Sequence, residues 1–465
     1  MMYNLGTLIK YEYKKLLHRR SVWVVTLSLT ALTLVSVVLP PFMTSVSIED
    51  SLNYTDYEET VTQRKLAADL AGRAIDEDLL REMNAVHSLE RFAVLSENQQ
   101  KTLTPESEQS SQTGTGQPLL SDELLSALPD DLRSRLPEDL SSVRLEDLTA
   151  FPGSDVPYSV KYNDIDYFYD DSGAASADGF EQADDGGFPQ YSTSTEELYN
   201  LRRSTNEMIW DARHLTDGEK EYLSDREDAL STPFLYEFSA GYKSILSNTV
   251  LLAIIISFFT AICIPPVSAD EHLRRTDQLI LCTRFGRRQA FLAKLFTAAT
   301  FSMAVALLLF AALAIPAFLM YGTEGFSAQI QIALPGCSWD LTMGEAVLIL
   351  LAVLLTSALL LSSAALTLGE RFQNSLQASG ILIGVLLVSA FLNIPDQYRI
   401  PSQILSFFPA KLLSVSGSLL ESQLVPFLGT YLASWQTGLI LYLILSLLFA
   451  LAGYFVYRRW QAGGR

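Results

Sequence analysis

Several groups on which enzymes depend are scarce or missing in this sequence. The chain of 465 residues has only four histidines and three cysteines. No HExxH pattern and no paired Cys and His spacing predicts a zinc site. The GxxxxGK[ST] pattern, whose backbone N–H groups bind nucleotide phosphates, is also missing. We therefore expect this chain to be no enzyme and to bind no cofactor or metal itself.

Charged residues and histidines are absent from six long apolar stretches. Each has about the 20 residues that a helix needs to cross a hydrocarbon core about 30 Å thick. The stretches are 21–43, 245–267, 295–321, 346–368, 376–394 and 437–457. An ion channel or ion-coupled carrier usually keeps titratable side chains in its spans, so their absence disfavours both classes. The fold class that we predict is a mainly α, polytopic membrane protein with six transmembrane helices.

Acidic charge is concentrated between the first two stretches, in residues 44–240, which we call the insert. The insert contains 42 Asp and Glu against 15 Lys and Arg, whereas the rest of the chain contains 10 against 18. It contains no cysteine, which fits a bacterial cell surface better than a disulfide-rich eukaryotic one. Acidic composition also disfavours a nucleic-acid partner. We expect an extracellular, mostly helical domain.

Residue patterns within the insert predict its local structure. We expect a long helix over Tyr57–Arg91, a strand or aromatic loop over Pro157–Tyr169, and helix again over Thr195–Ala229. Stretches rich in Ser, Gly, Gln and Asp, Glu108–Gln117 and Asp170–Pro189, read as linkers.

Lys and Arg alternate between the two sides of the predicted spans. Fifteen of them lie before the first span, in 268–294, in the loop after the fourth span and in the tail 458–465, whereas 322–345 and 395–436 hold only Arg399 and Lys411. By the positive-inside rule, both termini are cytoplasmic in a multi-pass bacterial cell membrane protein. Residues 1–20 predict an amphipathic helix on the inner leaflet, or simply topogenic charges. Segment 395–436 is expected outside, with possible re-entrant helices.

The cytoplasmic loop 268–294, SADEHLRRTDQLILCTRFGRRQAFLAK, is too long for a simple turn. An amphipathic stretch flanked by charges predicts a short helix on the membrane face, broken near Gly286. Such a helix could dock a soluble partner. A basic hairpin that only fixes the topology explains these residues equally well.

This loop also carries a family resemblance. An acidic residue is followed by a Thr, apolar residues, basic residues and a Lys that enters the third span. These residues are Glu271, Thr276, Leu279, Ile280, Leu281, Arg284, Gly286, Arg287 and Lys294. With the basic N-terminal helix and six spans, the arrangement resembles the permease subunit of a type-2 ABC exporter. Arg275 and Thr283 depart from the family pattern, which often has Gly and Pro there. The insert matches the family only loosely, in that permeases similar to those of Gram-positive bacteria often have a large domain between the first two spans.

The resemblance implies a function and partners. The loop would be the coupling helix that contacts a separate ABC ATP-binding subunit, which would bind ATP and magnesium. We name Glu271, Thr276, Leu279, Arg284 and Arg287 as its ATPase-coupling residues. A second permease copy or a related permease would complete the pathway, and uncharged spans favour export of an amphiphilic substrate. The alternative is a membrane-anchored sensor or scaffold with an extracellular ligand-binding domain.

Overall fold

The computed structural model describes residues 2–39, 57–102, 122–137, 143–151, 154, 156–171, 194–273, 288–427 and 429–462. Most of these residues are helical, and five helices are long and apolar enough to cross a membrane. They are α2 (Arg20–Val38), α12 (Thr249–Cys263) with its continuation α13 (Pro265–Leu273), α15 (Arg288–Tyr321), α17 (Met343–Phe372) and α22 (Ser434–Ala462). The prediction of a mainly helical polytopic membrane protein is confirmed at this level.

The fifth apolar run forms a shorter helix than the others. α18 (Ser375–Phe391) has 17 residues, which correspond to about 26 Å of helix against about 30 Å of hydrocarbon. Leu392 leaves the helix with extended backbone angles, three residues before Pro395. The predicted span to residue 394 therefore extends three residues beyond the helix.

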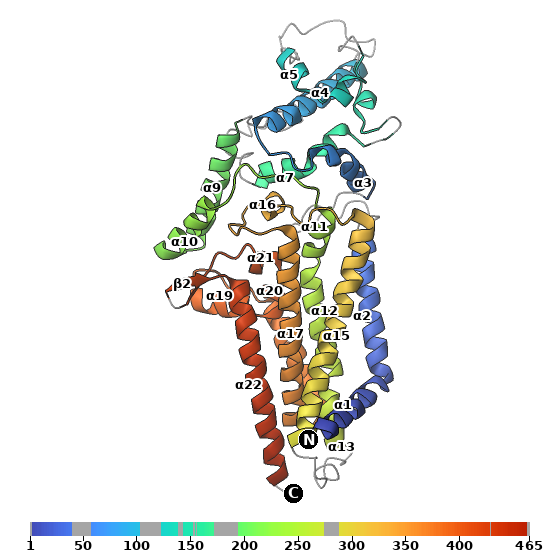
Figure 1. Cartoon of the computed structure of the whole chain (residues 1–465), viewed down its shortest axis with the longest axis vertical. Helices are drawn as coiled ribbons and strands as arrows, with labels where there is room; N and C mark the ends of the chain where they lie inside the picture. Colours follow the sequence, from blue (N-terminus) through green and yellow to red (C-terminus); the bar gives the residue numbers. More distant parts are fainter. Residues whose placement is uncertain are drawn as a thin grey trace.

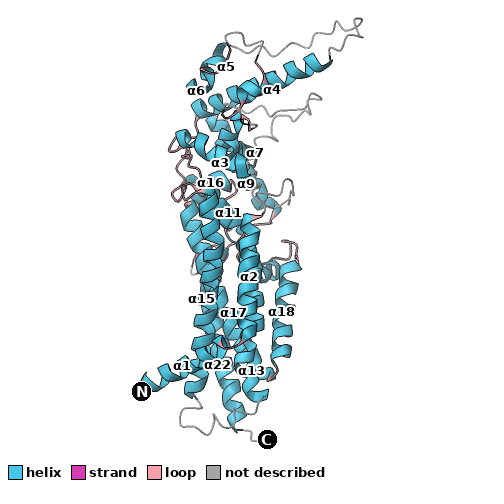
Figure 2. Ribbon diagram, turned by 90° about the vertical axis from the view of Figure 1, so that its right-hand side faces the viewer, coloured by secondary structure: helices cyan, strands magenta, loops and turns pink. Residues whose placement is uncertain are grey.

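The long helices form one bundle around α17, which packs against α12, α13, α15, α18 and α22 (Figure 1). α1 (Met2–Leu17) crosses the bundle against α15 and α2, and both chain termini lie at this end, which we call the termini end (Figure 2). Close contact between α17 and α22 depends on Gly453, where a Cβ would lie 2.7 Å from the Thr367 hydroxyl. That hydroxyl reaches across to the carbonyl of Phe449, at 2.8 Å.

The insert lies on the opposite end of the bundle, which we call the insert end (Figure 1). Its elements are α3 (Tyr57–Leu66), η2 (Ala67–Leu70), α4 (Glu77–Thr102), α5 (Asp122–Ala127), α6 (Asp130–Arg133), η4 (Leu145–Leu148), η5 (Tyr158–Tyr162), α7 (Asn163–Asp171), α9 (Thr195–Ala212) and α10 (Asp217–Asp228). Most of them share a core separate from that of the bundle. α9 and α10 instead send Trp210, Leu215 and Leu223 into the core of the bundle.

Two predicted helices of the insert are present but interrupted. The single helix over Tyr57–Arg91 is broken after η2, where Gly72 takes φ +79° and its N–H bonds to the Tyr236 carbonyl. Helix over Thr195–Ala229 is split between α9 and α10, with His214 at φ 55°. Both breaks need backbone angles that helices exclude. The linker predicted at Glu108–Gln117 lies outside the described residues. Of the linker predicted at Asp170–Pro189, Asp170 and Asp171 instead end the helix α7, and the rest lies outside the described residues.

Pro157–Tyr169 is not a strand. It forms η5 and α7. Its aromatic residues fit one side of a helix as well as they fit the alternating pattern of a strand. Tyr158, Tyr162, Ile165 and Phe168 are all fully or almost fully buried. Their spacing of three to four residues is that of a helix side.

Short elements complete the insert end of the bundle. α11 (Ala240–Ser247) leads into α12, and α16 (Ile330–Ala333) lies in the loop before α17. Segment 395–436 contains α19 (Arg399–Ser406), α20 (Pro409–Leu412) and α21 (Val415–Ser418). An antiparallel hairpin of β1 (Val425–Phe427) and β2 (Thr430–Leu432), which the sequence did not predict, follows them.

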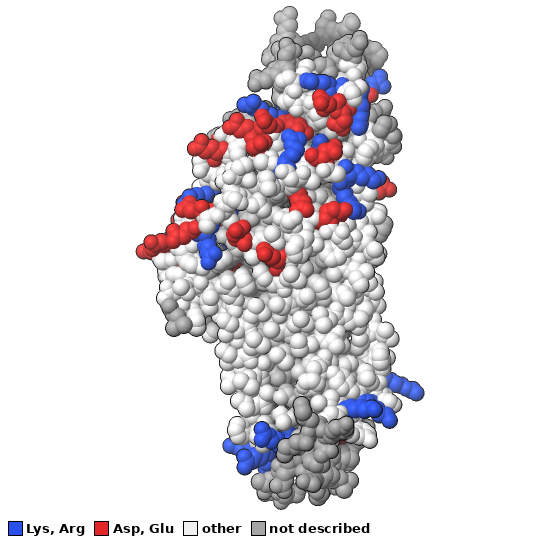
Figure 3. Space-filling model, viewed as in Figure 1, with Lys and Arg blue, Asp and Glu red and all other residues white. Residues whose placement is uncertain are grey.

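Charged side chains divide the face of the molecule drawn in Figure 3 into three zones. Figure 3 shows acidic and basic residues mixed over the insert, a broad belt without either over the bundle, and only basic residues at the termini end. The belt is the surface that the apolar helices α2, α15 and α22 present to their surroundings, with exposed side chains such as Leu27, Leu319 and Leu447. An uncharged belt of this kind is the surface that a lipid bilayer would cover.

Candidate functional site

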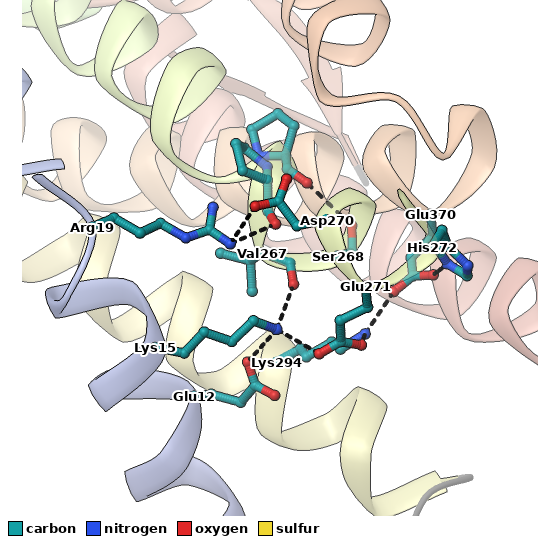
Figure 4. Close-up of polar contacts among 12 residues, drawn as sticks. Glu12, Lys15, Arg19, Val267, Ser268, Asp270, Glu271, His272, Lys294 and Glu370 are labelled. Carbon is teal, nitrogen blue, oxygen red and sulfur yellow. Dashed lines mark hydrogen bonds and ion pairs between the residues drawn. The ribbon is translucent and has the colours of Figure 1, made fainter. Parts of the chain in front are cut away.

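A buried ion-pair network joins the helices at the termini end, and we treat it as the candidate functional site (Figure 4). Its centre is Lys294 of α15, whose side chain is only 1% exposed. The ammonium lies 2.6 Å from the Glu271 carboxylate of α13 and 3.3 Å from that of Glu370 on α17. It also lies 5.2 Å from the ring centre of Tyr457 on α22. One cation thereby connects four helices.

The N-terminal helix is attached to the same centre. Lys15 of α1 donates to the Glu271 carboxylate and to the Val267 carbonyl, at 3.2 Å for the latter. Arg19, between α1 and α2, pairs with Asp270 at 3.0 Å and donates to the Pro266 carbonyl at 2.9 Å. These two carbonyls belong to the first turn of α13. The position of α1 across the bundle is therefore fixed by charge as well as by apolar packing.

His272 closes the network on the side of α17. Its Nε2 lies 3.0 Å from the second oxygen of Glu370, so both carboxylate oxygens of that residue have partners. Glu370 has no exposed side-chain surface. A buried carboxylate is tolerated in a protein interior when it is paired and hydrogen-bonded, as it is here.

Glu12 is the weakly held member of the network. It lies 3.5 Å from Lys15, and its Oε2 is buried without a hydrogen-bond partner among the described residues. Burial raises the pKa of Glu12, although the charge of Lys15 opposes this.

The structure places one of the five predicted coupling residues. Glu271 is at the end of α13, where its side chain is 7% exposed and shared between two lysines. It therefore holds the start of the loop to α1 and α15 and does not offer a free carboxylate to another protein. Thr276, Leu279, Arg284 and Arg287 lie outside the described residues.

Sequence reasoning missed most of the network. Lys294 was noted only for its place in the loop, and Lys15 and Arg19 only as basic residues before the first span. Glu370 was not considered, because the predicted fourth span stops at residue 368. One signal was available: acidic residues are rare at this basic end, so those directly at helix ends, such as Glu271 and Glu370, are candidates for internal pairing.

A second polar cluster fastens α9 and α10 to the bundle at the insert end. Arg202 of α9 and Glu227 of α10 form a buried pair at 2.7 Å, with both side chains less than 5% exposed. The same guanidinium donates to the carbonyls of Pro335 and Cys337, at 2.8 and 3.1 Å, in the loop before α17. Asn206 donates to Glu227 at 3.1 Å. The insert is thus held to the chain segment that enters α17.

Glu219 of α10 makes a further connection, to segment 395–436. Its carboxylate accepts from Arg399 and, at 3.1 Å, from the backbone N–H of Leu424. Burial by itself would raise the pKa of Glu219, but the hydrogen bonds from Arg399 and Thr216 outweigh burial and lower it. Nearby, Arg213 pairs with Glu421 at 3.1 Å. α9 and α10 therefore contact both loops that cover the insert end.

Among the described residues, no group of three or more His, Cys, Asp or Glu is placed to hold a metal ion. The two clusters join helices and loops to one another by ion pairs and hydrogen bonds. The chain matches no known protein-family model, no curated protein and no solved structure.

Proposed function

We propose that this chain is the membrane-spanning permease subunit of an ATP-driven ABC transporter, which exports an amphiphilic substrate and takes its energy from a separate ATP-binding subunit. The observation that carries the proposal is the ion-pair network at the termini end. Glu271, three residues before segment 274–287, pairs with Lys15 of α1 and Lys294 of α15. Lys294 in turn pairs with Glu370 of α17. A partner that moves this loop would therefore move three other helices with it.

Energy transfer through this loop sets a physical requirement. A partner shifts the helices only if it binds their two arrangements with different affinity, because equal affinity shifts no equilibrium. An ATPase that changes shape on binding ATP meets that requirement. The proposed contact residues are Thr276, Leu279, Arg284 and Arg287, while Glu271 passes the movement to Lys15 and Lys294. A second permease copy or a related permease would complete the pathway.

The proposed setting is a bacterial cell membrane, with both termini cytoplasmic and the insert outside. The distribution of basic residues supports it. Arg288 begins α15, Arg458 and Arg459 lie near the end of α22, and Figure 3 shows basic residues at the termini end beside the uncharged belt. Accessibility of a cysteine introduced at position 459 to a membrane-impermeant reagent tests this orientation. Labelling from the outside of intact cells would contradict it.

The decisive experiment is purification of the full chain from its native membrane, with sequencing of any co-purified protein and measurement of ATP hydrolysis. We expect a partner with a GxxxxGK[ST] pattern, and ATPase activity that falls when Arg287→Glu is introduced or residues 276–284 are deleted. Arg459→Glu, an exposed charge reversal at the same end, is the matched control and should leave activity unchanged. An intact complex with unchanged activity after the deletion would refute the coupling role.

One observation favours the alternative of a sensor or scaffold. The insert is fastened to the bundle through buried polar contacts, so a ligand bound by the insert could change the position of the helices. Under this alternative no ATPase co-purifies, whereas removal of the insert abolishes a response of the cell to an external compound.

A further inference from the structure

An apolar cavity with one cation at its edge lies between α12, α18 and α20. Its volume is about 440 Å³, within the range of sites that bind small molecules. The lining residues are Val250, Ile254, Ser257, Phe258, Ile383, Leu386, Leu387, Ala390, Phe391, Ala410, Lys411 and Ser414. Leu387 is 38% exposed and Phe391 is 84% exposed, so the cavity opens along α18 toward the uncharged belt.

The polar lining groups other than Lys411 are already hydrogen-bonded. The Ser257 hydroxyl donates to the Ala253 carbonyl at 2.6 Å. Ser414 donates to the Lys411 carbonyl at 2.5 Å and accepts from the Gly417 N–H at 2.9 Å. For the Lys411 ammonium, in contrast, the described part of the chain supplies neither an ion pair nor a side-chain hydrogen bond. The cavity is therefore an apolar surface with a single available charge.

Lys411 is held in place by its own segment. Its N–H bonds to the Phe408 carbonyl at 3.0 Å, and the next residue, Leu412, is fully buried. Leu412 packs against Gly438 of α22, where an added Cβ would lie 2.3 Å from it. The backbone of Lys411 is therefore fixed at the insert end, while its long side chain remains free to reach a ligand.

Cavity length matches one leaflet of a bilayer. From Val250 to Phe258, α12 rises about 12 Å, and half of a hydrocarbon core is about 15 Å. The lining residues Ile383 to Phe391 belong to α18, and Lys411 comes from α20. A straight apolar chain would fill this space with its polar end beside the ammonium.

We propose that this cavity binds a lipid-like amphiphile, with its acyl chain between α12 and α18 and an anionic head group on Lys411. Charge complementarity selects the head group, because a zwitterionic one brings a second cation to the same place. The proposal requires only that the bundle is embedded in a membrane. It stands whether or not the chain is a permease.

The test uses the full chain in detergent micelles and lysophosphatidylglycerol with a diazirine in its acyl chain, compared with the same probe on a phosphocholine head group. We expect saturable photolabelling of α12 and α18 by the anionic probe. Lys411→Gln should weaken it about fivefold, the size expected for one lysine near an anionic head group, and Lys411→Arg should restore it. Lys220→Gln, an exposed lysine of the insert, is the matched control and should change nothing.

A second variant separates the apolar requirement from the charge. Ala390→Phe fills the cavity and should abolish labelling by both probes, whereas Ala452→Phe, on the exposed face of α22, should not. Equal labelling of the parent and Lys411→Gln would overturn the proposal, as would labelling that never saturates and spreads over all exposed helices. Disulfide-linked dimers through Phe391→Cys that exclude the probe would also overturn it, by assigning the cavity to a second copy.

Discussion

Replacing Lys294 by methionine tests whether the buried network determines the structure of the termini end. Methionine has a similar length and removes only the charge. Lys294 is fully buried, and its loss leaves Glu271 and Glu370 without their shared partner. Removing one member of a buried pair typically costs about 3–5 kcal/mol. Lys15 still holds Glu271 and His272 still holds Glu370, so we expect the lower end, about 3 kcal/mol.

A double-mutant cycle turns this expectation into a measurement of the pair. Glu370→Gln alone leaves Lys294 with one carboxylate, whereas Lys294→Met combined with Glu370→Gln removes a charge of each sign. The double variant should therefore be less destabilised than the sum of the single ones, by about 1–3 kcal/mol, the usual coupling of residues in contact. Free energies of unfolding in mixed micelles, with the unfolding temperature as a second readout, supply the values.

The matched control is Lys220→Met, which removes an exposed lysine from α10 that pairs with Asp211. Exposed ion pairs contribute little, so its unfolding temperature should stay at the parent value. The reasoning would be refuted if Lys294→Met unfolded like the parent chain, or if the two network substitutions were simply additive. Either result would mean that apolar packing alone positions α13, α15 and α17.

Other expectations concern a buried acid, the clamp of the insert and one close backbone approach. Burial raises the pKa of Glu12 above its ordinary value of 4.5, so its contribution to stability is complete below that pH and is lost as the pH rises through the raised pKa. The unfolding temperature of Glu12→Gln should therefore rise relative to that of the parent as the pH is raised above 4.5. Arg202→Met should destabilise the chain by about 3 kcal/mol or more and increase proteolysis of α9 and α10, because Glu227 then stays buried without its partner; a protease-resistant variant would contradict the clamp. Gly241→Ala should cost about 1–3 kcal/mol, since its Cβ would lie 2.4 Å from a backbone oxygen, whereas Gly380→Ala, in open space, should be tolerated; equal unfolding temperatures for the two would count against this packing.

The long helices could be located from the sequence because membrane helices have a strong local signal. Five of the six apolar runs correspond to helices long enough to span a membrane, and the remaining run, 376–394, corresponds to the shorter α18. The end of α18 was predicted three residues too far along the chain, because the uncharged run continues to Ile394 although the helix ends at Phe391. The insert was predicted less well, because its breaks depend on residues such as Gly72 that are held by distant parts of the chain.

The ion-pair network could not be read from the sequence for the same reason. Lys294 is 76 residues away from Glu370, and Lys15 is 256 residues away from Glu271. Hydrophobic periodicity predicts that helices exist, but not which of their ends meet. The basic residues were correctly recognised as a cluster along the sequence, yet their pairing with the few acids at this end follows only from the way α1 and α13 cross α15.

The two polar clusters have α17 in common, although they lie at opposite ends of the bundle. Glu370 attaches one end of α17 to Lys294 and His272. Arg202 attaches the insert to Pro335 and Cys337, in the loop that leads into its other end. α17 has 30 residues, or about 45 Å of helix, and its packing against α15 and α22 is apolar over most of that length. Under the proposed function, a movement of α13 would reach the insert both along α12 and α11 and through Glu370, α17 and the loop that Arg202 holds.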